Sequence, residues 1–146
     1  MAPRLPLAHQ QPLCSSVTAS DIKHAVFSIP GIKSPSPDGF NSTFFKDAWD
    51  CHGPLTTVVV QQFFRTSFLP PSFGHTKLVL LPKQNPPTTA WDFRPISCCS
   101  VIYKTIAKVL ASRLKLVLPV LVHPNQGAFV PDRDLLYNVL ISQDIV

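Results

Sequence analysis

Two basic residues on either side of a loop are the side chains best suited to bind an anionic group. The apolar residues 78–81 end at Pro82-Lys83, and a second short segment beyond the loop carries Arg94. Extended segments around a loop rich in Pro, Thr and Asn predict a hairpin with one cation on each arm. Lys83 would offer a compact charge and Arg94 a planar fork of donors to a phosphate. The alternative is a proline-rich surface loop whose two cations are merely solvated.

A short antiparallel strand pair must position these two cations. We expect residues 76–81 to pair with residues 93–97, because apolar and branched side chains fill the first segment and turn-forming residues separate the two. Helical patterns dominate the remaining chain. The predicted fold class is therefore α+β, mainly helical, with one short antiparallel β pair.

A first helix is expected soon after the N-terminal region. Thr18 or Ser20 can cap it, with Asp21 in its first turn, and Pro30-Gly31 ends it. Its apolar face consists of Ile22, Ala25, Val26 and Ile29. Residues 1–16 mix Pro, Gln, Ser and His without periodicity, which predicts a disordered tail.

The next segment, residues 33–40, has the composition of a structured turn. Pro35 and Pro37 restrict φ, and Asp38-Gly39 offers a position at which φ can be positive. The alternative to a ligand-contacting loop is a simple connection between two helices.

Two further helices are predicted before the hairpin. Asn41 or Ser42 can cap the first, and Pro54 suits the start of the second, which would run to about Thr66. The run Val58-Val59-Val60 lowers helix propensity, so a strand is the alternative there. The first of the two would bury Phe44, Phe45 and Trp49.

The clearest helical pattern covers residues 100–118, and Pro119 would end or kink that helix. Its apolar stripe consists of Ile102, Ile106, Val109, Leu110, Leu114 and Val117. Lys104, Lys108 and Lys115 lie on the other face with Arg113 at its edge, where they could follow a phosphate backbone or simply be solvated. A last amphipathic helix is expected over residues 135–146.

Composition limits the class of protein. The formal net charge is +5 and all eight acidic residues are aspartates, which suggests an anionic partner such as nucleic acid. The four cysteines lack metal-binding spacing and predict reduced thiols in an intracellular protein. We expect no signal peptide and no membrane-spanning segment, whereas nucleus and cytoplasm are not distinguished.

Four ordered motifs carry a resemblance to a known family. The first is S-I-P at 28–30 with K-S-P-S-P-D-G-F at 33–40, and the second is L-L-P-K at 80–83 followed by D-F-R-P-I-S at 92–97. The third is Y-K-T-I-A-K-V-L-A-S-R-L at 103–114, and the fourth is P-N-Q-G-A-F-V at 124–130. Over about residues 17–146 the chain resembles the fingers of reverse transcriptases from non-LTR (LINE-type) retrotransposons, especially those abundant in plant genomes. The resemblance implies an RNA or DNA template-primer and a deoxynucleoside triphosphate as partners.

The same resemblance suggests roles for individual residues. Lys83 and Arg94 would contact the triphosphate, and Gln126 and Phe129 would belong to the loop behind the nucleotide. Nucleic-acid contacts would come from Lys33, Lys104, Lys108, Arg113 and Arg133. Two positions depart from the family pattern: Ser36 replaces a usual glycine, and Asp132 replaces another and could pair with Arg133.

The resemblance also implies what this chain lacks. An intact family member would hold two Mg²⁺ ions on palm aspartates beyond residue 146, so we assign no catalytic residue, metal ligand or cofactor here. Asp132 and Asp134 alternate without supporting ligands. Residues 17–146 are thus expected to be a partial reverse transcriptase domain, fingers and the start of the palm, inactive without a missing C-terminal palm segment. The alternatives are a non-catalytic basic nucleic-acid-binding module or a non-functional product of a decayed element.

Overall fold

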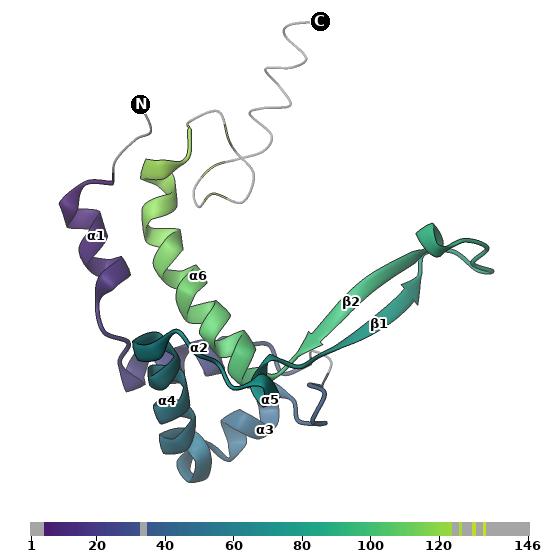
Figure 1. The fold of residues 1–146 in the computed structure, drawn as a ribbon, viewed down its shortest axis with the longest axis horizontal. Coiled ribbons are helices and arrows are strands. Elements are labelled where there is room, and N and C mark those ends of the chain that lie inside the picture. Colours follow the sequence, from purple (N-terminus) through teal and green to yellow (C-terminus); the bar gives the residue numbers. More distant parts are fainter. Residues whose placement is uncertain (1–4, 33–34, 124–125, 127–129, 131–132, 134–146) are drawn as a thin grey trace, which may run out of the picture. The chain divides into compact units, whose positions relative to one another are not determined.

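The computed structural model describes residues 5–32, 35–123, 126, 130 and 133 (Figure 1). It divides into two compact units, one formed by Val17–Val109 and the other by Met1–Ser16 together with Leu110–Val146. The elements are α1 (Leu7–Cys14), α2 (Ala19–Phe27), α3 (Ser42–Asp47), α4 (Trp49–Thr66), α5 (Pro71–Gly74), β1 (Thr76–Pro82), the 3₁₀ helix η1 (Ala90–Asp92), β2 (Phe93–Cys99) and α6 (Val101–Leu121). The predicted α+β class, mainly helical with one antiparallel strand pair, is confirmed.

Local capping begins α2 and α3 where the sequence predicts. The Thr18 hydroxyl accepts from the Asp21 amide at 3.1 Å, and the Asp21 carboxylate accepts from the Thr18 amide at 3.0 Å. This reciprocal pair satisfies two amide donors that helix geometry leaves free. The Asn41 side chain likewise accepts from the Phe44 amide at 3.0 Å.

The predicted start of the third helix at Pro54 is wrong, because α4 begins at Trp49 and contains Pro54. Packing explains the earlier start. The Trp49 ring lies edge-on to Phe27, with 5.8 Å between ring centroids, and packs against the core of this unit. Gly53 leaves room for that ring, since a Cβ there would lie 2.7 Å from Trp49 Cε2. The valine run is helical rather than a strand.

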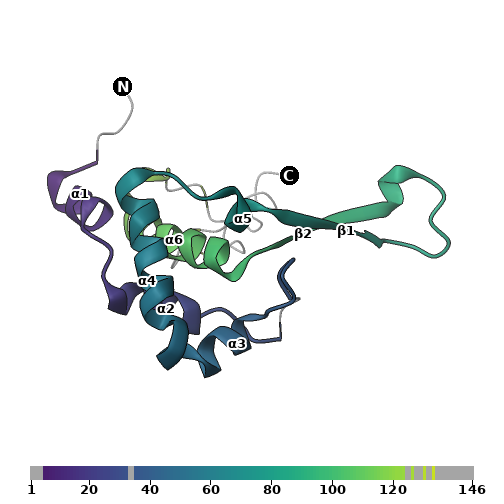
Figure 2. The ribbon, with the colours of Figure 1, turned by 60° about the horizontal axis from the view of Figure 1, so that its bottom comes forward.

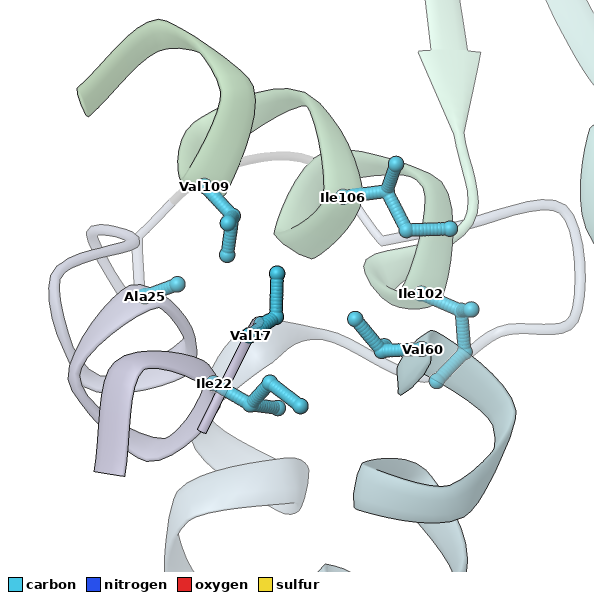
Figure 3. Packing of buried hydrophobic residues seen from close by; sticks show 7 residues of the cluster. All are labelled: Val17, Ile22, Ala25, Val60, Ile102, Ile106 and Val109. Atoms are coloured by element: carbon cyan, nitrogen blue, oxygen red, sulfur yellow. The ribbon is translucent and has the colours of Figure 1, made fainter. Parts of the chain in front are cut away.

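Three helices build the core of the Val17–Val109 unit (Figure 3). The α2 face that the sequence predicts is buried, and it meets Val60 of α4 and the first half of α6. The buried cluster consists of Val17, Ile22, Ala25, Val60, Ile102, Ile106 and Val109. The predicted stripe on α6 holds only in part, since Leu110 and Leu114 are 42% and 49% exposed.

The strand pair extends away from the helices of its unit (Figure 2). The two predicted segments pair, and β2 continues past the predicted end at residue 97, so that Thr76 lies opposite Cys99 and Leu81 opposite Arg94. Ser100 closes its base, because its hydroxyl donates to the Phe73 carbonyl at 2.7 Å and accepts from the Tyr103 amide at 3.1 Å. That hydroxyl therefore joins the residues before β1 to the first turn of α6.

The alternating hydrogen bonds between β1 and β2 leave the backbone nitrogens of two prolines pointing away from the partner strand. The Lys83 amide donates to the Asp92 carbonyl at 2.6 Å, so the Lys83 nitrogen points at the other strand. Because successive amides point to opposite sides of a strand, the nitrogen of Pro82 points outward. The same alternation, together with the pairing of Leu80 and Pro95, directs the nitrogen of Pro95 outward on the other edge.

The second unit departs from the sequence prediction at its N-terminal end. Helix α1 occupies part of the segment predicted as a disordered tail. The side-chain Nε2 of Gln10 donates to the Leu5 carbonyl at 2.8 Å, and the Arg113 guanidinium donates to the Leu13 carbonyl at 3.2 Å, contacts that hydropathy cannot predict. Helix α6 continues past Pro119 to Leu121. The predicted helix over residues 135–146 lies outside the described residues.

In the described ranges, no helix combines the length and apolar character needed to cross a bilayer. All four cysteines are free thiols, as the spacing predicts.

Candidate anion-binding site

Lys83 and Arg94 lie on one face of the hairpin near its tip. Leu81 pairs directly with Arg94, and directly opposite residues in an antiparallel pair share a face. Lys83 follows Leu81 by two positions and therefore lies on that face too. Both cations are exposed. The predicted pair of cations is thus presented together to any ligand that approaches this face.

The main chain of the tip holds the Lys83 ammonium in place. Lys83 Nζ donates to the Trp91 carbonyl at 2.7 Å. An ammonium has three donor hydrogens, so this bond leaves two for another acceptor. Lys83 is therefore fixed at one end of the exposed face while it keeps donors to offer.

Asp92 organises the turn that carries this carbonyl. Its Oδ2 accepts from the amides of Thr88 and Thr89 at 2.9 and 2.7 Å, and from their hydroxyls at 3.2 and 3.1 Å. The two amide bonds hold the pKa of the Asp92 carboxyl at about 2, below its ordinary 3.8. The spacing Thr89-x-x-Asp92 is a capping-box pattern from which this interaction could have been predicted.

A cavity of about 410 Å³ lies between the turn at 35–39 and the same face of the hairpin. Its lining consists of Pro35, Ser36, Pro37, Gly39, Lys77, Val79, Leu81, Ile96 and Cys98. By the strand register, its five hairpin residues share the face of Arg94. The cavity thus adds a third cation, Lys77, to that face.

The turn beside the cavity has the predicted glycine conformation. Gly39 has a φ of 87°, and its amide donates to the Ser36 carbonyl at 2.9 Å. Ser36, which replaces the usual glycine of the family, does not have a positive φ, since Ser67 is the non-glycine residue with positive φ among the described residues. The Ser36 hydroxyl is nevertheless unusual, because the residue is 5% exposed and its oxygen has no hydrogen-bond partner in the described part of the chain.

The predicted nucleic-acid contacts on α6 fall into different units. Lys104 and Lys108 lie one helical turn apart in the Val17–Val109 unit, whereas Arg113 belongs to the other unit and bonds to Leu13 there.

Gln126 is described, and its amide donates to the His123 carbonyl at 3.0 Å. Lys33, Phe129, Asp132 and Asp134 lie outside the described residues.

Arg133 binds the end of α6. Its guanidinium donates to the carbonyls of Pro119, Val122, His123 and Gln126 at distances between 2.6 and 3.0 Å. Carbonyls in the last turn of a helix lack intrahelical donors, and an arginine can supply them. The sequence indicates a cation here but not this capping role.

The described carboxylates do not fit a divalent-metal site. Asp21 accepts from Thr18, Asp38 from the Phe40 amide at 3.0 Å, and Asp92 from Thr88 and Thr89. No group of three or more His, Cys or acidic residues lies close enough to hold a metal ion among the residues that the structure describes.

Comparison with known proteins connects the chain to a transposon. No protein-family model matches it. It is 35% identical over 130 residues to the Transposon TX1 uncharacterized 149 kDa protein of Xenopus laevis, a match that covers 89% of this chain. The chain spans about a tenth of that relative's length. The similarity supports an origin in a transposable element.

Proposed function

We propose that this chain is the fingers portion of the reverse transcriptase of a non-LTR (LINE-type) retrotransposon, and that its hairpin binds phosphates of a nucleotide or nucleic acid. The observation that carries the proposal is the pairing of Leu81 with Arg94, which puts Lys83 and Arg94 on one exposed face. Similarity to a transposon protein supports the same origin.

The two cations suit phosphate in complementary ways. Arg94 is exposed and can donate two parallel bonds to one phosphate group. Lys83 is anchored on the Trp91 carbonyl, so it loses less side-chain freedom when it binds a second oxygen. Lys77 lies farther from the tip on the same face and extends the positive charge along the hairpin. This arrangement binds phosphate groups but does not recognise base sequence.

We assign binding but no catalytic step to this chain. Two Mg²⁺ ions would supply the charge stabilisation for nucleotidyl transfer in an intact enzyme. Asp21, Asp38 and Asp92 bond to nearby backbone groups, and no metal-binding group of three His, Cys or acidic residues lies among the described residues. The hairpin does not need those metals to hold anionic oxygens.

The proposal is tested by the salt dependence of binding. Labelled single-stranded and duplex oligonucleotides are titrated with the chain at several salt concentrations. If about three to five phosphates are neutralised on duplex, log K should fall with log salt at a slope of about −3 to −4.5. The double variant Lys83→Ala/Arg94→Ala should flatten that slope by about two.

A charge-matched double variant, Lys23→Ala/Arg65→Ala, serves as the control, because both cations lie on helices away from the hairpin. Equal changes of slope in the two double variants would contradict a specific role for the hairpin. Absence of any nucleic-acid binding by the folded wild-type chain would overturn the proposed function.

A further inference from the structure

The tip of the hairpin exposes a large aromatic side chain. Trp91 is 86% exposed, whereas the other tryptophan, Trp49, is packed against the core. Trp91 belongs to η1, between the loop and β2. An isolated exposed aromatic residue needs no special explanation, so its surroundings decide what it can do.

Those surroundings fix Trp91 beside a cation. The carbonyl of Trp91 accepts the bond from Lys83 Nζ at 2.7 Å. The next residue, Asp92, accepts four hydrogen bonds from Thr88 and Thr89. The backbone on either side of the indole is therefore held in a defined turn, and an ammonium group is held against it.

We propose that the Trp91 indole is a stacking platform for an unpaired base of a single-stranded nucleic acid, while Lys83 binds the adjoining phosphate. This proposal rests on the proposed function and names the part of the ligand that meets the tip. Aromatic rings stack on bases with little sequence preference because every base has a π-face. A base inside a duplex has both faces covered, so an unpaired base is the suitable partner.

The charge and polarity of the tip favour this ligand over an apolar protein or a lipid surface. The loop before Trp91 holds polar residues, Gln84, Asn85 and the two threonines, together with Pro86 and Pro87. The hairpin face carries Lys77, Lys83 and Arg94, and the nearby Asp92 carboxylate accepts local donors. A nucleic-acid strand combines the flat apolar surface and the negative charge that these groups complement.

Tryptophan fluorescence provides the test, since one of the two tryptophans is exposed and the other is packed. The probes are an oligothymidylate, a blunt-ended duplex of two complementary strands and inorganic tripolyphosphate. We expect the oligothymidylate to quench the emission of the wild-type chain, and this quenching to disappear in Trp91→Phe, where the remaining signal comes from Trp49. Trp91→Ala should weaken oligothymidylate binding by about five- to 150-fold, and Trp91→Phe by less.

Tripolyphosphate has no base, so its affinity should be the same in the wild type and in Trp91→Ala. The stacking proposal would be overturned if Trp91→Ala bound oligothymidylate with unchanged affinity while Lys83→Ala/Arg94→Ala still changed the salt dependence of binding. That result would leave the proposed phosphate binding by Lys83 and Arg94 intact. An equal loss of affinity for the blunt duplex would also overturn the stacking proposal. Failure of the wild type to bind any of the three probes would instead contradict the proposed function itself.

Discussion

Oxygen Oδ2 of Asp92 lies 2.7 Å from the main-chain nitrogen of Thr89 and accepts its hydrogen, along with three further hydrogens from Thr88 and Thr89. One ionised carboxylate therefore orders the turn on which the Lys83 ammonium rests. This relationship connects the protonation of one side chain to the geometry of the candidate site.

We predict that the order of the tip depends on pH with a midpoint near 2. The folded-state pKa of Asp92 is lowered to about 2 from 3.8, so the stabilisation is fully present above 3.8 and is lost as pH falls through about 2. Amide chemical shifts of Thr88 and Thr89, measured by NMR down to acid pH, should follow that midpoint. In Asp92→Ala, which lacks the carboxyl group, the amide chemical shifts of Thr88 and Thr89 should not change as pH falls through about 2. A midpoint near 3.8 would show that the four bonds do not favour the charged form.

We predict that Gly53→Ala destabilises the Val17–Val109 unit although alanine is the better helix former. The new Cβ would lie 2.7 Å from Trp49 Cε2, so the ring or the helix must shift, at a cost of about 1–3 kcal/mol. Gly74→Ala is the matched control, because a Cβ there meets no atom within 4 Å. Urea denaturation followed by tryptophan emission measures both variants. A Gly53→Ala variant as stable as Gly74→Ala would contradict the close approach of Trp49.

We predict that Arg133→Lys loosens the end of α6 while it keeps the charge. Lysine lacks the planar fork that reaches four carbonyls, so a loss of about 1 kcal/mol is expected for that end of the helix. Hydrogen exchange at the amides of Val122 and Gln126 should become faster. Arg65→Lys is the control, since Arg65 makes one side-chain bond of 3.3 Å to Gln62. If Arg133→Lys weakened nucleic-acid binding without faster exchange, the predicted nucleic-acid role of Arg133 would be supported over capping.

We predict that the purified chain does not extend a primer. Metal ions supply most of the charge stabilisation in nucleotidyl transfer, and the described carboxylates do not group to hold them. The assay offers a primed RNA template, four deoxynucleoside triphosphates and Mg²⁺ or Mn²⁺. Extension that disappears in Arg94→Ala would contradict our assignment of binding without catalysis. A heat-denatured sample and an unrelated protein purified in parallel control for contaminating polymerases.

Local chemistry made several elements predictable from the sequence. Thr18 and Asp21 specify the start of α2 within a single turn, and Asn41 does the same for α3. The hairpin was predictable because its two arms and its loop differ sharply in composition. The cation pair of Lys83 and Arg94 followed from that hairpin, since their positions relative to the loop set which arm each occupies.

Contacts between distant residues explain what the sequence did not reveal. The start of α4 depends on Trp49 packing against Phe27, and α1 receives a bond from Arg113, far along the chain. Arg133 could be identified as a cation, but its four acceptors lie in the last turn of α6 and in the residues that follow it, where the sequence predicted that Pro119 would end or kink the helix. Such interactions depend on tertiary geometry, which periodicity and propensity do not encode.

The two outward-pointing prolines of the hairpin have a consequence for how the chain behaves at high concentration. A two-stranded sheet has two open edges, each of which can accept a further strand from another molecule. Pro82 on β1 and Pro95 on β2 remove a donor from each edge where an added strand would need one. The hairpin can therefore expose Leu78 and Leu80 to solvent while both edges resist the strand-by-strand addition that leads to fibrils.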